Sequence, residues 1–435
     1  MLLIYLPVVA SRCKYIFDII FKHEFGIRYN TTTDIKIFEA HQQEKIKYSY
    51  ARIGAEIFIK SSTFLFSKTI EKINIPVEKK NETNVLFSND SSCDIGFDIF
   101  AAIFYMVSRY EEYLPFVPDK QGRFKASDSI AYQNNFLQYP IVDIWIKHFK
   151  NKLAEKFPSL KFRSSSFNSV FTYDIDIAYA FRGRNIYRLT GAIIKDILKL
   201  KFKNIFNRLS SLSTKKDPWD VYDYLKEIIV RNKLNSIFFF LLGDYSRHDK
   251  NISYHHPLMI KLIRKISAFS YIGIHPSYKS STTPGKILSE KIRLEKISNK
   301  QITKSRQHYL KFKLPDTYNQ LAAAGIMQDY SMGFAETHGF RAGTCKPFYF
   351  YDLRNERSTL FKVFPITCME ASFLYYSKRK PAESLDIILT LINEVKKVDG
   401  TFISIWHNNT VSDEGIFKEW KWVHNEMIKR VLEIS

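Results

Sequence analysis

The sequence predicts an α/β protein in which a distorted (β/α) barrel follows a smaller α/β domain. Two observations indicate this architecture. Residues 166–435 alternate short apolar runs with helical patterns, which is typical of parallel strands joined by helices. The loop-like stretch Ser164–Ser166 separates this region from residues 1–165, whose pattern has a different character. With 435 residues, of which 45% are hydrophobic, the chain is long enough for two or three domains with a sizeable core.

The barrel region, residues 166–435, contains six predicted strands and five predicted helices. Asp217 and Pro218 are expected to cap and start the first of these helices. So many strand–helix units within about 270 residues favour a closed or nearly closed barrel over an open sheet. The predicted strands are Ser169–Asp176, Ser236–Gly243, Tyr271–His275, Gly325–Tyr330, Phe361–Thr367 and Phe402–His407. The predicted helices are Trp219–Asn232, Pro257–Ala268, Lys286–Ile297, Asp316–Ala324 and Ala382–Val398.

Residues 1–165 form the predicted N-terminal α/β domain, to which the sequence assigns no function. A long helix is expected over Phe97–Tyr113, because apolar residues recur along it at helical spacing. Its polar and aromatic end, Ser108–Tyr113, is interpreted as a solvated helix end with ion pairs, although a binding role stays open. The predicted strands are Leu2–Leu6, Lys36–Phe38, Lys45–Tyr50 and Glu56–Lys60.

Composition and charge restrict the classes of function. The net charge of +21 favours contact with polyanions, but a generally basic surface explains it equally well. The chain shows no helix-turn-helix, zinc-finger or RNP pattern, so we expect no specific nucleic-acid partner. No run reaches the ~18 apolar residues of a membrane span.

The chain start and the cysteines favour a cytoplasmic protein. Met1–Ala10 is apolar, but no basic residue precedes it, so we expect a folded, uncleaved start. The four cysteines form no C-x-x-C pair and suggest no disulfide framework. Cys345 is a weak candidate nucleophile, because no dedicated base lies beside it in the sequence.

Four ionisable residues lie at the C-terminal ends of predicted barrel strands: Asp174, Asp176, His275 and His407. In a (β/α) barrel these strand ends converge on one mouth, where active sites are built. Asp174 and Asp176 are two residues apart in a strand and therefore project to the same face. The sequence thus predicts that the four side chains meet.

A divalent metal would account for the chemistry of these residue types. Two adjacent carboxylates repel unless a cation neutralises them; one can then ligate while the other accepts a proton from the hydrolytic water. His275 is a suitable nitrogen ligand, and His407 could protonate a leaving nitrogen. Arg341, between small residues, could hold a carboxylate. Each residue also has a plainer reading, as a solvated acid, a structural histidine or a surface arginine.

In this order, the segments resemble the polysaccharide deacetylase superfamily, the carbohydrate esterases with a NodB-homology domain. Thr172-Tyr173-Asp174-Ile175-Asp176 is similar to its first motif, T-F-D-D-G-P. His275 resembles the first histidine of the H-S/T-x-x-H motif, Arg341 loosely matches the third motif, and Ile405-Trp406-His407 matches the fifth. The resemblance covers about residues 166–435 and implies a distorted, incomplete (β/α) barrel.

The resemblance also implies the role of each residue. Asp174 would be the general base, Asp176 and His275 metal ligands, Arg341 the residue that orients Asp174, and His407 the general acid. Lys279 occupies the position of the second motif's second histidine and cannot ligate while protonated. We expect His308 to supply the third ligand. Weaker candidates are His248, His255, His256 and His338, and Glu370 could buttress the arginine.

The resulting hypothesis is a metal-dependent hydrolase, with zinc as the expected metal, that removes an acetyl group from an amino sugar of a polysaccharide or its precursor. An O-acyl bond is also possible. The alternatives are a catalytically inactive glycan-binding module and a membrane- or polyanion-associated module on the same barrel. The second alternative rests on Arg182–Lys216, which is basic and amphipathic and could contact an anionic membrane or an acidic glycan. That segment could equally be a helical excursion that packs on the barrel.

Overall fold

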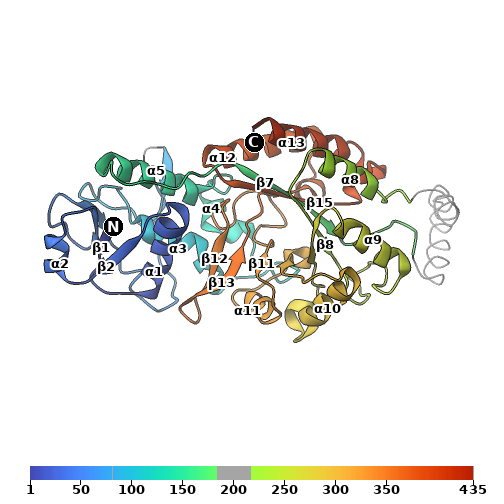
Figure 1. Cartoon of the computed structure of the whole chain (residues 1–435), viewed down its shortest axis with the longest axis horizontal. Coiled ribbons are helices and arrows are strands. Elements are labelled where there is room, and N and C mark those ends of the chain that lie inside the picture. Colours follow the sequence, from blue (N-terminus) through green and yellow to red (C-terminus); the bar gives the residue numbers. More distant parts are fainter. Residues whose placement is uncertain (81, 184–216, 435) are drawn as a thin grey trace.

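The computed structural model describes residues 1–80, 82–183 and 217–434 (Figure 1). Most of the basic segment Arg182–Lys216 therefore lies outside the described residues. The N-terminal domain lies at one end of the molecule, and the barrel occupies the remainder (Figure 1).

A nine-stranded sheet forms the centre of the C-terminal domain, in the order β12-β13-β11-β10-β9-β8-β7-β15-β14. Neighbouring strands are parallel, except for the antiparallel pair β12 and β13. Within the described residues the edge strands β12 and β14 do not pair, so the sheet curls into an open half-barrel. The predicted distorted barrel is confirmed, with incomplete closure. The strands are β7 (Asn168–Ile175), β8 (Ser236–Phe240), β9 (Tyr271–Ile274), β10 (Lys304–Ser305), β11 (Gln328–Asp329), β12 (Phe348–Asp352), β13 (Arg357–Val363), β14 (Cys368–Met369) and β15 (Thr401–His407).

Amphipathic helices cover the outside of this sheet, with α12 and α13 packed side by side (Figure 1). The helices are α8 (Tyr222–Arg231), α9 (Pro257–Ser267), α10 (Lys286–Ser298), α11 (Asp316–Ala323), α12 (Pro381–Lys397) and α13 (Trp420–Ile434). Single turns connect the elements: η4 (Ser280–Thr282), η5 (His308–Leu310), η6 (Ser372–Tyr376), η7 (Thr410–Ser412) and η8 (Gly415–Phe417).

The helix predicted over Trp219–Asn232 begins later than expected. The helix α8 starts at Tyr222, and the Asp217 carboxylate instead accepts hydrogen bonds from the backbone N–H groups of Ala180, Phe181 and Arg182. Asp217 thus anchors the chain that follows β7. The strands β10, β12 and β14 and the helix α13 were not predicted. β10 and β14 have only two residues each, too few to produce a periodic signal.

A four-stranded parallel sheet, in the order β2-β1-β3-β4, organises the N-terminal domain. A buried layer of aromatic and aliphatic side chains packs this sheet against α1, α3 and α5. The strands are β1 (Leu2–Tyr5), β2 (Tyr29–Thr32), β3 (Lys45–Ser49) and β4 (Ile57–Lys60), with a separate hairpin of β5 (Glu78–Lys80) and β6 (Thr83–Val85). The helical segments are α1 (Ser11–Phe17), η1 (Asp18–Glu24), α2 (Ile35–Ala40), α3 (Ile99–Val107), η2 (Tyr110–Tyr113), η3 (Ala126–Asp128), α4 (Ile130–Gln133) and α5 (Ile141–Lys156).

Two predictions of secondary structure for this domain are wrong. Lys36–Phe38, predicted as a strand, lies in α2, because the Asp34 side chain caps the helix by accepting the N–H groups of Lys36 and Ile37. The long helix predicted over Phe97–Tyr113 ends at Val107, since Arg109 adopts a left-handed conformation with φ 54°.

The segment Ser108–Tyr113 is not a solvated helix end but part of a buried contact between the domains. Arg109 pairs with Glu111 and Glu112, and Glu112 forms a two-pronged ion pair with Arg341 of the barrel. All four side chains are at most 8% exposed. The predicted ion pairs exist, but they connect the two domains in the interior.

None of the helices in the described ranges combines enough length and apolar character to cross a bilayer. The four cysteines are unpaired and buried. Cys345 lies against the Asp143 carboxylate, and burial together with that charge raises the pKa of its thiol well above the usual value. A thiol in this setting is a poor nucleophile.

Candidate metal centre and active site

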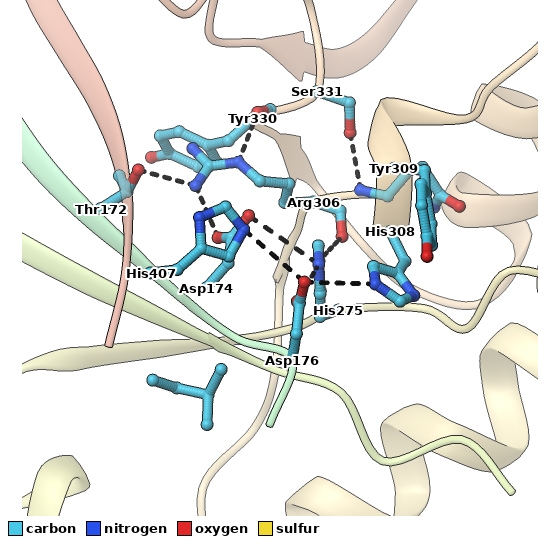
Figure 2. Close-up of polar contacts among 12 residues, drawn as sticks. Thr172, Asp174, Asp176, His275, Arg306, His308, Tyr309, Tyr330, Ser331 and His407 are labelled. Atoms are coloured by element: carbon cyan, nitrogen blue, oxygen red, sulfur yellow. Dashed lines mark hydrogen bonds and ion pairs between the residues drawn. The ribbon is translucent and has the colours of Figure 1, made fainter. Parts of the chain in front are cut away.

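A cavity of about 250 Å³ opens at the C-terminal ends of β7, β9, β10 and β15. Figure 2 shows that five side chains face one another there: Asp174 in β7, Asp176 directly after it, His275 after β9, His308 after β10 and His407 at the end of β15. The register accounts for part of this convergence, because His407 pairs with Asp174 across the β15–β7 ladder. The cavity is lined by Arg123, Asp174, Asp176, Ile177, His275, Gln307, His308, Tyr309, Leu310, Ala335, Met369, Ala371, Tyr375, Tyr376, His407, Asn409 and Thr410.

Asp176, His275 and His308 form a group that could hold a metal ion. Their ligand atoms lie within 4.8 Å of one another. One Asp176 oxygen is 3.1 Å from Nε2 of His275, and the other is 3.3 Å from Nε2 of His308. Two imidazole nitrogens and one carboxylate oxygen are a donor set typical of catalytic zinc, which has three protein ligands and one open position.

The hydrogen bonds of the two imidazoles direct their Nε2 atoms toward Asp176. Nδ1 of His275 lies 2.5 Å from the carbonyl oxygen of Arg306, which can only accept a hydrogen bond. Nδ1 of His308 lies 2.9 Å from the Asp249 carboxylate. In the neutral rings the proton is therefore on Nδ1, and the Nε2 lone pairs face the Asp176 oxygens. Such partners are the usual supports of metal-bound histidines.

The Asp176 carboxylate provides a direct test of whether a cation fits. Its Oδ1 is buried and has no hydrogen-bond partner among the described residues. When the His275 ring is neutral, its Nε2 lone pair faces this oxygen, and a cation between them would satisfy both atoms. Burial alone would raise the pKa of Asp176, but the neighbouring His308 and His275 lower it well below its usual range. The site thus favours an ionised carboxylate.

The second carboxylate, Asp174, is held by Arg306. Nη1 of this arginine donates to Oδ1 of Asp174 at 2.8 Å and to Oγ1 of Thr172 at 2.7 Å, and its Nε donates to the carbonyl of Tyr330 (Figure 2). The Arg306 side chain is fully buried and lies over the ring of Phe239. The other Asp174 oxygen is 3.8 Å from Nε2 of His275. Asp174 is therefore fixed beside the candidate metal ligands.

The expectation that Arg341 orients Asp174 is wrong. The Arg341 guanidinium is buried between the domains, where it binds Glu112 and the carbonyl of Gly333. Arg306 takes the expected position because it follows β10, whose end meets those of β9 and β11. The alternation Arg306-Gln307-His308 was the available signal, but β10 is too short to be recognised in the sequence.

His407 faces the same cavity, and the carboxylate of Glu370 holds its Nδ1 atom in place. Nδ1 lies 2.6 Å from Oε1 of Glu370, and Nε2 is 3.6 Å from Asp176. Glu370, a candidate to buttress the arginine, instead binds His407 and accepts a hydrogen bond from Thr410. Burial lowers the pKa of His407, but the Glu370 carboxylate raises it to about 10. His407 therefore carries a proton at neutral pH.

The remaining histidine candidates and Lys279 lie outside this group. Lys279 is exposed, in the turn that precedes η4. His248 stacks on Tyr278 and His338 on Phe373, and the His255 ring contacts Tyr254 at a tilt. His256 caps α9 by accepting the N–H of Leu258.

Sequence reasoning missed Asp249 and Arg123 at this site. Asp249 supports His308, and its carboxylate also accepts hydrogen bonds from Ser246 and Tyr278. Arg123 belongs to the N-terminal domain, but its Nη1 donates to the carbonyl of Tyr309, whose ring lies 4.4 Å from that of His308. Neither residue lies at a strand end, so only the folded chain reveals them.

Comparisons with known proteins divide the chain in two. Residues 2–158 match a family of unknown function, DUF7033. No curated protein matches the chain in sequence. Among solved structures, a candidate polysaccharide deacetylase from Mycobacterium smegmatis is 12% identical over 63% of this chain and 86% of its own, with a TM-score of 0.42.

Two further structures are similar at lower scores. The polysaccharide deacetylase of Bacillus cereus is 10% identical over 62% of this chain and 87% of its own, with a TM-score of 0.29. A CE4 family pseudoenzyme from Bacillus anthracis is 9% identical over 62% of this chain and 66% of its own, with a TM-score of 0.31. Because these likenesses are remote, the function proposed below rests on the geometry of the site.

Proposed function

We propose that the C-terminal domain is a metal-dependent hydrolase that removes an acetyl group from an amino sugar of a polysaccharide or its precursor. One observation carries this proposal: the Nε2 atoms of His275 and His308 face the Asp176 carboxylate inside a cavity that is also lined by the carboxylate of Asp174 and the imidazole of His407. Asp176, His275 and His308 would hold the metal, for which zinc is the first choice on donor chemistry.

The residues around the ligands supply the proton transfers of amide hydrolysis. A divalent metal held there supplies Lewis acidity toward the attacking water and the acyl carbonyl. Asp174, fixed by Arg306, takes one proton from the water while the water oxygen bonds to the acyl carbon. His407, protonated because Glu370 raises its pKa, donates a proton to the leaving nitrogen. The products are a carboxylic acid and a free amine.

The cavity supports a sugar as substrate. Its volume of about 250 Å³ is close to the lower end of the ~300–1,000 Å³ range typical of small-molecule sites. Tyr375 and Tyr376 line it and are 50% and 45% exposed, so their rings offer flat faces to a ligand. An O-acetyl ester would fit the same groups, because its leaving oxygen also needs a proton.

The test combines metal analysis with acetate release from chitotetraose and from an O-acetylated xylan. The wild-type chain should bind about one zinc equivalent and release acetate. Asp174→Asn should keep the metal and lose roughly 10²-fold or more in kcat, as expected for a general base. His308→Ala should lose both, whereas His255→Ala, which removes an exposed imidazole outside the cavity, should lose neither.

Two outcomes would contradict the proposal: a chain that binds no zinc or cobalt, or an Asp174→Asn variant as active as the wild type. Either result would favour the inactive glycan-binding module. Lys279, at the position of a motif histidine, speaks for that alternative, whereas the ligand atoms of Asp176, His275 and His308, all within 4.8 Å of one another, support the enzyme. Contact with an anionic membrane through Arg182–Lys216 also remains a prediction.

A further inference from the structure

A second cavity, of about 580 Å³, adjoins the metal centre and is built by both domains. Arg123 and Tyr376 line both cavities, so the two cavities are neighbours that share part of their walls. It is lined by Asp119, Lys120, Gln121, Arg123, Lys125, Ala126, Ser127 and Tyr132 of the N-terminal domain and by Glu336, Thr337, His338, Tyr376, Ser377 and Arg379 of the barrel.

The charges of this second cavity are unbalanced in favour of cations. Four basic and two acidic residues line it. Arg123 is neutralised by Asp119, whose other oxygen accepts backbone N–H groups. Lys120 and Arg379 are exposed and have no carboxylate partner within the described residues. Two cationic side chains are therefore available to a ligand.

The acidic groups in and near the cavity do not neutralise its excess of positive charge. One oxygen of Glu336 accepts the backbone N–H of Ala126 at 2.6 Å. Lys125 lies 3.5 Å from Asp128, and both side chains are about one-third exposed. Such a surface pair contributes little and leaves the lysine free to turn toward an anion. Tyr132 and Tyr376, each nearly half exposed, add two ring faces to the walls.

We infer that this cavity is a subsite for an anionic group attached to the sugar held at the metal centre, either a phosphate on that sugar or a carboxylate on the neighbouring unit. This anionic group would contact Lys120 and Arg379. The substrate class is thus an acidic glycan or a sugar phosphate, and the N-terminal domain takes part in its selection. The inference rests on the proposed function, because the first cavity is taken to hold the acetylated sugar.

The experiment measures binding by calorimetry at low salt to the full-length protein, with three probes. Hyaluronan tetrasaccharide carries uronate carboxylates, N-acetylglucosamine 1-phosphate carries a phosphate, and chitotetraose is neutral. The wild type should bind at least one acidic probe about fivefold to tenfold more tightly than chitotetraose, the combined effect of two partly exposed ion pairs. The preferred acidic probe then distinguishes carboxylate from phosphate.

Matched variants separate the subsite from general charge. K120Q/R379Q should lose the preference for the acidic probe while chitotetraose binding stays unchanged. K156Q/K226Q removes two exposed lysines outside the cavities and should keep the preference. The inference is overturned if no acidic probe is preferred or if both double variants behave alike. Acetate release is scored separately, so a protein that binds the acidic probe through Lys120 and Arg379 without hydrolysis would refute only the proposed function.

Discussion

The pairing of Asp174 with Arg306 leads to a quantitative prediction about stability. Both side chains are buried, at 4% and 0% exposure, and Nη1 of Arg306 lies 2.8 Å from Oδ1 of Asp174. In Arg306→Met the carboxylate of Asp174 would lack its countercharge, and Thr172 would lose a hydrogen-bond donor. Breaking a buried pair in this way costs about 3–5 kcal/mol of unfolding free energy.

A double-mutant cycle distinguishes this pair from the one that the sequence suggested. In D174N/R306M the loss should be smaller than the sum of the single losses by roughly 1–3 kcal/mol, because no uncompensated charge remains. In D174N/R341M the losses should add within about 0.5 kcal/mol, since Arg341 pairs with Glu112 instead. Urea denaturation followed by circular dichroism, with EDTA present to exclude metal effects, measures each free energy. Coupling of Asp174 to Arg341 but not to Arg306 would refute this account of the site.

Three further predictions concern pH, the core and the strand that carries His275. Burial lowers the pKa of His308, but Asp176 and Asp249 raise it to about 9, so zinc must displace a proton from His308 below that pH. The affinity for zinc should therefore fall by up to about tenfold for each unit that the pH decreases below 9. Calorimetry in buffers of different ionisation enthalpy should detect the released proton. An affinity independent of pH would contradict this. Burial lowers the pKa of His424 to about 3, below the ordinary histidine value of about 6.5, so only the unfolded chain binds the proton between those two pH values. Stability should be complete above pH 6.5 and fall as pH decreases toward 3, by at most ~1.4 kcal/mol per unit. His424→Gln should flatten this slope in denaturation curves, and an unchanged slope would disprove the assignment. A Cβ at Gly273 would lie 2.5 Å from the Phe239 ring and 2.9 Å from the Lys304 carbonyl, so Gly273→Ala should cost about 1–3 kcal/mol and reduce zinc occupancy by shifting His275. Stability and occupancy equal to the wild type would show that β9 has more room than the structure indicates.

Much of the barrel could be predicted because its signals are local. Apolar runs mark the buried strands β7, β8, β9 and β15, and the helices between them carry clear 3.6-residue patterns. Elements that depend on their neighbours were missed, such as the two-residue strands β10 and β14. Lys36–Phe38 was mistaken for a strand because the capping carboxylate of Asp34, rather than apolar periodicity, decides that a helix forms there.

The candidate site shows the same division. Asp174, Asp176, His275 and His407 were predicted to meet because parallel strands end at one edge, and the structure brings them together with His308. The sequence did not point to Arg306, because the strand β10 that precedes it has only two residues, Lys304 and Ser305, and leaves no apolar run in the sequence. The distinction arises from what surrounds each guanidinium: Asp174 for Arg306 and Glu112 for Arg341.

By itself, the sequence determined the order of the longer barrel strands β7, β8, β9 and β15 and the chemistry available at their ends, since both depend on residues close together in the chain. Only the tertiary structure decided which partner each charged side chain meets. Arg123 contacts Tyr309 at the metal centre across 186 positions of sequence, and Glu112 contacts Arg341 across 229. Such contacts leave no periodic trace in the sequence, because packing between domains, rather than local conformation, brings the atoms within bonding distance.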